Sequence, residues 1–578
     1  MSNPYDEKPW LAWYASGVAA ELDFPTAPLT RILDDAANSW PRRKALIFLG
    51  RATTYRQLVR MVDRFAGALK KLGVVRGDRV ALILPNCPQN VIAFYAVLRL
   101  GAVVVQHNPL YTESELHHQL SDSGAKVAIV FDKAYERLAA AQEGTQVRHV
   151  IVTSLIDYLP RLKQALLKLP LEKAQEKRDL LGEEIPPDAP VLHFDELIES
   201  DVFPARQARV DAQRDLALLQ YTGGTTGRPK GAMLTHYNLV ANAYQTKSWD
   251  PAMRPGRETT LAVLPLFHAY GLTLCLTTTI LCGGTLVLLP TFDLDLVFQA
   301  VNKWKPTIFP GVPPMYSQII DSPKVDKHNL ESIRTCVSGA MRLPPEIVDR
   351  FQKATGGGHL VEGYGLTETS PVALANPLNA NARAGTVGLP ISNTQARVVD
   401  EFDIDPEKIC PVGVAGELLV RGPQVFHGYW NQPEDSAAML SDDGWCRTGD
   451  IAVMSPSGFF TVIDRKRDVI MASGFSIYPS EIEDVVRSHP AVHDAAVIGI
   501  PDAYRGETVK TCVMLRPGQQ LTEGELIEHC TQHLAPYKIP KVVEFREELP
   551  RNLIGKVLRR VLREEHEQAM ATAEPSTA

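Results

Sequence analysis

Short apolar runs alternate with amphipathic stretches along much of the chain. Residues 79–84 are apolar, residues 89–100 have the spacing of a helix, and residues 102–105 are apolar again. Further apolar runs follow at residues 126–131, 149–153, 216–220, 307–310 and 335–338. Thr112 and Glu115 form a capping box, which predicts the start of a helix between two of these runs. Strands that alternate with helices predict parallel sheets with helices on both faces.

The pattern changes after Gly444. Residues 458–463 predict a strand, a helix is expected from Pro479, and residues 495–500 predict another strand. A stretch of about 110 residues of this kind suits a small α+β domain. The tail beyond Gln568 is rich in Ala, Glu, Ser and Thr, and we expect it to be disordered.

Two stretches raise the question of a membrane. Residues 259–292 lack Asp, Glu, Lys and Arg and are long enough to span a bilayer, but prolines and glycines interrupt them. We expect a short strand, a helix near residues 272–281 and a strand near residues 285–289, all buried. Residues 157–185 are basic and amphipathic, which suits either a solvated surface helix or a helix that lies on a membrane surface.

Composition narrows the choice of partners and compartment. The 578 residues are too many for one hydrophobic core, and the net charge of −7 offers no large basic field for nucleic acid. None of the eight cysteines forms a CxxC pair, which is typical of reduced thiols in a cytoplasmic enzyme. The first residues carry acidic side chains and no apolar run, so we expect no secretory signal.

The strongest local motif is TGGTTGRPKG, which follows the predicted strand at residues 216–220. Glycines let backbone N–H groups approach an anion, and hydroxyl and ammonium groups add donors. The residues that could cradle a phosphate are Thr222, Gly223, Gly224, Thr225, Thr226, Gly227 and Lys230. The motif is not a Walker A loop, because Pro229 precedes the lysine and Gly231 follows it.

A second motif, EGYGLTET, covers residues 362–369. Tyr364 offers a flat face for a base, Thr367 a hydroxyl for a phosphate, and Glu368 an oxygen ligand for Mg²⁺. Further along, Asp450 ends an RTGD sequence, and its carboxylate could accept bonds from both ribose hydroxyls.

Together these motifs resemble those of the adenylate-forming superfamily, which includes acyl-CoA synthetases, nonribosomal adenylation domains and firefly luciferase. The motifs follow the family's order over nearly the whole chain, which looks most like bacterial long-chain fatty-acid–CoA ligases. The resemblance implies an α/β fold with a large N-terminal domain of layered sheets plus a β-subdomain, and a small mobile α+β domain at the C-terminus. It implies a boundary between residues 1–463 and 464–578, with Asp464 as the hinge.

The resemblance also implies roles for individual residues. Tyr364 would stack on adenine, Thr367 would contact the α-phosphate, and Glu368 would hold magnesium. Asp450 and Arg465 would bind the ribose. The nucleotide site would further include Gly339, Ala340, Glu362, Gly363, Gly365 and the loop residues 222–230.

Lys556, in the sequence NLIGK, matches the family's catalytic lysine. Its role makes physical sense, because a carboxylate that attacks a phosphate needs a cation between the two anions. The other candidate catalytic residues are Thr226, Glu368 and His268. His268 lies in a segment that resembles the wall of the acyl pocket, and lining or gating that pocket suits it better than base catalysis. Ser473, Gly474 and Phe475 would approach the coenzyme A channel after a hinge rotation.

The implied activity is ATP- and Mg²⁺-dependent activation of a medium- or long-chain fatty acid to its acyl-adenylate, followed by transfer to coenzyme A. Two alternatives stay open: an acyl-AMP ligase that loads a carrier protein, and a non-catalytic adenylate- or lipid-binding scaffold. We expect a cytoplasmic protein that can contact the inner face of the membrane and does not bind nucleic acid. Oligomeric state and chain-length preference do not follow from the sequence.

Overall fold

The chain forms two compact units. The computed structural model describes residues 4–200, 203–222, 229–400, 408–472, 475–502, 505–552 and 555–573. The large unit comprises Trp10–Ala396 and Val420–Cys446, and the small unit comprises Met1–Pro9, Arg397–Leu419 and Arg447–Ala578.

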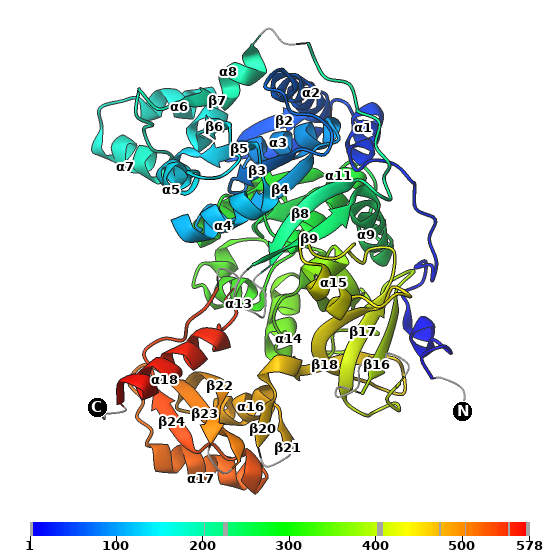
Figure 1. Ribbon diagram of the computed structural model, residues 1–578, viewed down its shortest axis with the longest axis vertical. Helices are drawn as coiled ribbons and strands as arrows, with labels where there is room; N and C mark the ends of the chain where they lie inside the picture. Colours follow the sequence, from blue (N-terminus) through cyan, green and yellow to red (C-terminus); the bar gives the residue numbers. More distant parts are fainter. Residues whose placement is uncertain are drawn as a thin grey trace. The chain divides into compact units, whose positions relative to one another are not determined.

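A seven-stranded sheet of order β7-β6-β5-β3-β4-β8-β9 is a main element of the large unit (Figure 1). All of its strand pairs are parallel except β8 with β9, as the alternation of strands and helices predicts. The strands are β3 Arg79–Ile83, β4 Val103–His107, β5 Val127–Phe131, β6 His149–Thr153, β7 Val191–His193, β8 Leu216–Thr222 and β9 Lys230–Thr235.

Helices pack on this sheet or on one another, and together they bury its apolar side chains. They include α1 Thr30–Ser39, α2 Tyr55–Lys71, α3 Pro88–Arg99, α4 Glu113–Ser123, α5 Tyr135–Ala141, α8 Phe194–Glu199 and α9 His236–Trp249. Every residue of α3 is buried, because this helix packs against both the sheet and α2. The capping box at Thr112 is confirmed. The backbone N–H of Thr112 donates to Glu115 Oε2 at 2.8 Å, and the backbone N–H of Glu115 donates to Thr112 Oγ1.

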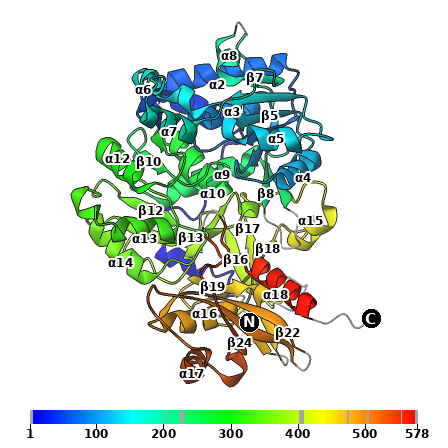
Figure 2. The same ribbon diagram turned by 90° about the vertical axis from the view of Figure 1, so that its left-hand side faces the viewer.

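A second layer of strands carries the central part of the large unit. It is built from two four-stranded sheets, β10-β11-β1-β2 and β12-β13-β14-β15. Their bounds are β1 Lys44–Phe48, β2 Arg51–Thr54, β10 Thr259–Ala262, β11 Thr285–Leu288, β12 Thr335–Ser338, β13 His359–Gly365, β14 Val372–Ala375 and β15 Leu389–Pro390. Helices α12 Leu294–Trp304, α13 Pro313–Asp321 and α14 Pro345–Ala354 pack on these strands, as Figure 2 shows.

The strand expected at residues 307–310 is not formed. Ile308 makes only isolated bridges, to Thr260 on one side and Thr335 on the other. Pro306 and Pro310 flank it, and since proline has no backbone N–H, a regular ladder cannot extend past them.

The uncharged stretch from residue 259 to 292 is buried and broken into short elements. It contains β10, α10 Ala269–Gly271, the π-helical segment η4 Leu272–Thr277, α11 Thr278–Leu281 and β11. This agrees with the strand–helix–strand order expected from the sequence. Among the described residues, no helix has the length and apolar character needed to span a bilayer.

The basic insert forms two helices rather than the single helix that we expected. They are α6 Arg161–Leu167 and α7 Glu172–Leu181. Pro170 lies between them, and its ring and missing N–H end the first helix. Figure 1 shows both helices near α5, at the edge of the large unit.

The small unit combines two sheets. One has the order β16-β17-β18-β19, and the other has the order β21-β20-β23-β22 with β24 paired to β23. The first two residues of β16, Gln395 and Ala396, are counted with the large unit. The bounds are β16 Gln395–Val399, β17 Gly416–Arg421, β18 Cys446–Met454, β19 Phe460–Arg465, β20 Ile470–Ala472, β21 Phe475–Ile477, β22 Val492–Asp502, β23 Gly506–Leu515 and β24 Val542–Phe545. The strand expected at residues 495–500 is confirmed within β22.

Three helices pack on the second sheet of the small unit or on each other: α16 Pro479–Ser488, α17 Glu523–His533 and α18 Arg559–Ala573. The helix predicted from Pro479 is confirmed. The expected disorder beyond Gln568 is wrong for residues 569–573, which continue α18 because four of these five residues are alanine or methionine, both good helix formers.

Leu82 lies fully buried in β3, at the centre of the seven-stranded sheet. We expect Leu82→Ala to lower the free energy of unfolding by about 2–5 kcal/mol, because it leaves a cavity that the sheet cannot close. Thermal unfolding measures the effect. Leu162→Ala is the control, because this side chain is 73% exposed and should leave the melting temperature nearly unchanged. Equal losses in the two variants would contradict the assigned core.

Candidate active site

Two of the sequence motifs meet at one edge of the central layer. β12 and β13 are parallel, with Ser338 opposite Glu362. Gly339 and Ala340 therefore follow β12 at the same edge at which residues 363–365 end β13. In layered α/β folds, ligands bind outside the carboxyl ends of the strands.

Packing explains the glycines of the EGYG motif. A Cβ at Gly365 would lie 1.7 Å from the carbonyl oxygen of Pro371, and one at Gly363 would lie 3.0 Å from Val337. Tyr364 between them is half-buried, whereas Glu362 is buried and accepts the N–H of Leu343 at 3.0 Å. Burial raises the pKa of Glu362 to about 7.

The candidate magnesium ligand and the loop lysine belong to one polar network. Glu368 is buried just after Thr367, and the hydroxyl of Tyr429 donates to its Oε1 at 2.5 Å. Burial and this carboxylate hold the pKa of Tyr429 well above its usual value, so the hydroxyl remains a donor. Lys230 Nζ lies 5.7 Å from the centre of the Tyr429 ring and forms an ion pair with Asp435 of α15 Pro433–Met439 at 2.5 Å.

The phosphate motif joins two neighbouring antiparallel strands. Thr222 ends β8 and pairs with Lys230, which begins β9. The predicted contacts of Gly223, Gly224, Thr225, Thr226 and Gly227 lie outside the described residues.

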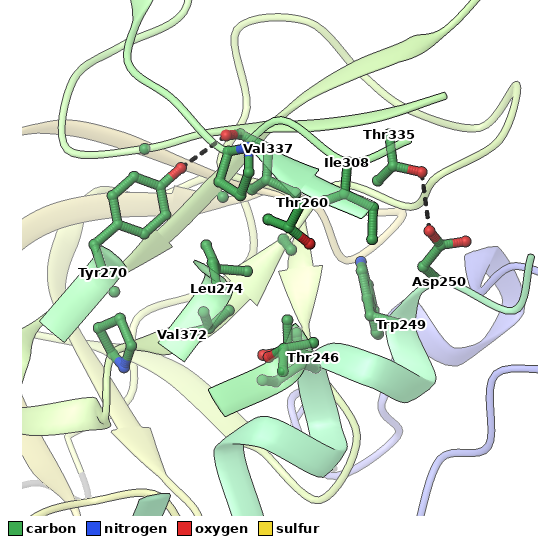
Figure 3. A pocket seen from close by; sticks show the side chains of 18 of the residues that line it. Thr246, Trp249, Asp250, Thr260, Tyr270, Leu274, Ile308, Thr335, Val337 and Val372 are labelled. Carbon is green, nitrogen blue, oxygen red and sulfur yellow. Dashed lines mark hydrogen bonds between the residues drawn. The ribbon is translucent and has the colours of Figure 1, made fainter. Parts of the chain in front are cut away.

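A cavity opens beside the motif residues. Gly339, Ala340, Gly363, Tyr364, Gly365 and Thr367 line it, together with a larger set of side chains from α9, β10, the helical segment 269–282 and β14. Most of that set is apolar. Figure 3 shows Tyr270 on one side of the cavity and Trp249 and Asp250 on the other. The cavity thus extends from the nucleotide motifs into the interior of the large unit.

His268 lines the same cavity and caps α10. Its Nδ1 accepts the backbone N–H of Tyr270 at 3.2 Å, which leaves the proton of a neutral ring on Nε2. Desolvation lowers the pKa of His268 to about 4, so the ring is neutral near pH 7. A neutral ring with a protonated Nε2 can line the pocket and donate a hydrogen bond, but in this tautomer it is not a general base.

Further predicted residues lie in the small unit. Asp450 and Arg465 are direct partners across the antiparallel strands β18 and β19, and Arg465 Nε is 2.6 Å from Asp450 Oδ1. The register of β18 and β19 therefore brings the motifs of Asp450 and Arg465 together, although they are separated along the sequence.

Lys556 lies near this pair. The positive charge of Arg465 and, secondarily, burial lower the pKa of the lysine to about 8, against the opposing effect of Asp450. The ammonium form therefore predominates at neutral pH.

The candidate hinge residue holds the start of a helix. Asp464 Oδ2 accepts the N–H of Ser480 in the first turn of α16 at 2.8 Å. Arg559, the first residue of α18, lies 3.7 Å from Asp464 and 2.8 Å from Glu483, and also approaches Asp468. Ser473 and Gly474 lie outside the described residues, as does the side chain of Phe475, which begins β21.

The sequence motifs do not include Tyr429, Asp435 or Arg559. Each is a single residue in an ordinary local context, and its partners lie far away in the chain. The clustering of three basic residues near Lys556, at positions 559, 560 and 563, was the one available signal.

Comparison with known proteins supports this assembly of motifs. Residues 33–430 match the model of the AMP-binding enzyme family, and residues 481–556 match that of the AMP-binding enzyme C-terminal domain. The long-chain-fatty-acid–CoA ligase of Bacillus subtilis is 41% identical over 569 residues, which cover 97% of this chain and 98% of the relative. The enzyme of the same name from Salmonella typhimurium is 39% identical over 563 residues, with the same coverage.

Solved structures agree. ATP-bound MatB from Rhodopseudomonas palustris is 28% identical, with a TM-score of 0.80 and coverage of 94% of this chain and 100% of that one. By sequence, domain order and fold, the chain therefore belongs to the family of AMP-binding enzymes, alongside the long-chain-fatty-acid–CoA ligases.

Proposed function

We propose that the protein activates a medium- or long-chain fatty acid with ATP and transfers the acyl group to coenzyme A. The observation that carries this proposal is the cavity of the large unit. At one end, residues of the adenylate motifs line it, and beyond them its walls are mostly apolar. Such a cavity suits an acid whose carboxylate meets the nucleotide and whose hydrocarbon tail is buried.

In the first step, a carboxylate oxygen attacks the α-phosphorus of ATP, the bond to the β-phosphate breaks, and pyrophosphate leaves. The ammonium of Lys556 offsets the repulsion between the two anions and stabilises the charge of the transition state. In the second step, the thiol sulfur of coenzyme A attacks the acyl carbonyl, AMP leaves and the thiol proton is released.

Glu368 suits a magnesium ion that arrives with the nucleotide. Mg²⁺ commonly uses one or two protein carboxylates together with substrate phosphates. Within the described residues, no group of three or more His, Cys, Asp or Glu side chains could hold a metal without the nucleotide. A bound ion would neutralise phosphate charge, and Tyr429 would orient the carboxylate that holds it.

The acceptor of the acyl group distinguishes this proposal from its main alternative. Relatives that span nearly the whole chain are named CoA ligases, which supports coenzyme A. Thioester formation with free coenzyme A tests this point. An enzyme that forms acyl-AMP but acylates only a carrier protein would instead be an acyl-AMP ligase.

The two steps need different groups near one carbonyl, so we propose that the small domain beyond Asp464 rotates between them. Lys556→Ala should then lower adenylation by roughly 10²–10³-fold, the effect of removing a group that stabilises transition-state charge. Thioester formation from supplied acyl-AMP should persist. Pyrophosphate exchange into ATP measures the first step, and release of AMP from synthetic acyl-AMP and coenzyme A measures the second.

Lys541→Ala, at an exposed lysine of the same unit, is the matched control and should leave both steps unchanged. Equal loss of both steps in Lys556→Ala would refute the separate roles.

Adenylation should fall as the pH rises through about 8. The sign follows from the lowered pKa of Lys556: the active ammonium is present below this pH and is lost above it. Arg465→Gln removes the neighbouring charge and should move the alkaline limb to higher pH, whereas Arg465→Lys should keep it near its original position. Rates of pyrophosphate exchange across neutral and alkaline pH measure both effects. If the rate falls at the same alkaline pH in the wild type and both variants, the fall does not come from the pKa of Lys556 as set by Arg465.

We also propose that α6 and α7 contact the surface of an anionic membrane. Five of the fourteen exposed large apolar side chains among the described residues lie here: Leu162, Leu166, Leu169, Leu171 and Leu180. Residues 161–181 carry six basic and three acidic side chains, although the chain as a whole is negative. Exposed leucines next to basic groups match the chemistry of an anionic lipid surface.

All eight cysteines are free and buried, which is consistent with the cytoplasmic location that we propose.

Leu162 and Leu166 lie one helical turn apart on α6. Replacing both with Glu should lower partition onto phosphatidylglycerol vesicles by roughly tenfold, because apolar burial is lost and negative charge is added. Co-sedimentation measures this partition. Leu110→Glu, at another exposed leucine of the large unit, is the control. If the double variant binds phosphatidylglycerol vesicles as well as the wild type does, α6 and α7 are not the membrane-binding surface. Equal binding of the wild type to neutral and anionic vesicles would contradict the role of the basic side chains.

A further inference from the structure

The far end of the acyl cavity is polar. Its floor there is formed by Thr260, Ile308 and Thr335, which lie side by side on neighbouring segments (Figure 3). The facing wall comes from the helical segment 269–282, of which Thr278 and Thr279 line the cavity. A cavity shaped only for a hydrocarbon end would be expected to close with apolar side chains.

Two independent measures give the depth of this polar end. From Gly339 back to Thr335, four residues of extended chain span about 13 Å. From Tyr270, which packs against Gly339, to Thr278, eight helical residues span at most about 12 Å, because Leu272–Thr277 is π-helical and rises less per residue than an α-helix. An extended backbone advances about 1.2 Å per bond, so the polar end lies about ten bonds from the mouth.

The hydroxyl of Thr278 has no hydrogen-bond partner among the described residues, although its residue is only 3% exposed. Its neighbours are satisfied: Thr277 donates to the carbonyl of Thr273, and Thr279 donates to Thr260 Oγ1 at 2.6 Å. Buried hydroxyls are nearly always paired. The hydroxyl of Thr278 is therefore available to a group inside the cavity.

Two carboxylates line the same end. Asp250 and Glu258 are both buried and share one cation, Arg334, at 2.9 and 3.2 Å. Asp250 also accepts bonds from Thr335 and the backbone of Ala252. Glu258 also accepts bonds from Thr307 and the backbone of Arg254. Each carboxylate thus receives three bonds out of about four that it can accept, so each can still take a donor.

We propose that this end of the cavity binds a hydroxyl group borne about ten bonds from the substrate's carboxyl carbon. A hydroxyl both accepts and donates, so it can pair with Thr278 and with Asp250 or Glu258. A distal carboxylate would instead be repelled by the two acidic side chains. The substrate class is therefore a medium-chain acid with a terminal hydroxyl. This inference rests on the proposed acid activation.

The test compares 10-hydroxydecanoic acid with decanoic acid, which have the same chain length. The wild-type enzyme should have a kcat/KM about tenfold higher for the hydroxy acid, as expected for one well-made hydrogen bond in a buried site. Thr278→Val keeps the shape of the side chain but removes the hydroxyl, and should abolish this preference while decanoate is still activated.

Two further variants separate recognition from general damage. Thr278→Ser keeps a hydroxyl and should keep the preference. Thr246→Val, at another cavity threonine whose hydroxyl already donates to the carbonyl of Asn242, should leave the ratio of the two acids unchanged.

Equal use of the two acids by the wild-type enzyme, or an unchanged ratio in Thr278→Val, overturns the inference while leaving acid activation intact. Failure of the wild-type enzyme to adenylate any acid overturns the proposed function itself, and this inference with it.

Discussion

The proposed reaction brings two anions together, and this repulsion explains the charges around the candidate site. A carboxylate can reach the α-phosphate only if positive charge lies between them or beside them. In the proposed mechanism, Lys556 would supply an ammonium group, Lys230 a second cation, and Glu368 a ligand for a divalent ion. Neighbouring cations repel each other, and the charge of Arg465 therefore lowers the pKa of Lys556 to about 8. The carboxylate of Asp450 partly offsets that effect.

Lys556 is tied to the candidate hinge through its neighbour in the chain. Three residues after the lysine, Arg559 begins α18 and lies near Asp464, Asp468 and Glu483. Asp464 in turn holds the first turn of α16. These buried ion pairs resist separation, because a charge left alone in a protein interior is strongly destabilising. The lysine, both helices and the hinge residue are therefore expected to move as one body.

The acyl cavity results from two regular elements with different periods. Along the strands, every second side chain faces the cavity, so Thr335 and Val337 lie on its floor. Along the facing helical segment the spacing is four, so Tyr270, Leu274 and Thr278 line its wall. Val337 is followed by Thr335 along the floor, and Leu274 by Thr278 along the wall, so both series change from an apolar to a hydroxyl-bearing side chain with depth. The cavity thus has an apolar middle and a polar end, a distribution that distinguishes acids by what they carry far from the carboxyl group.

Local sequence determined the elements and the chemistry of the motifs. Strand and helix periods and the capping box at Thr112 depend on neighbours within a few residues, so they could be predicted. Long-range contacts decided the rest. Tyr429 reaches Glu368 across 61 residues, and Arg465 pairs with Asp450 only through strand register. The Thr278 hydroxyl has no partner in the described part of the chain because of how the surrounding segments pack. The sequence by itself therefore determined which groups could act on a nucleotide and an acid. Only the tertiary structure decided which groups meet and which remain available to a substrate, because burial and pairing depend on residues distant in the chain.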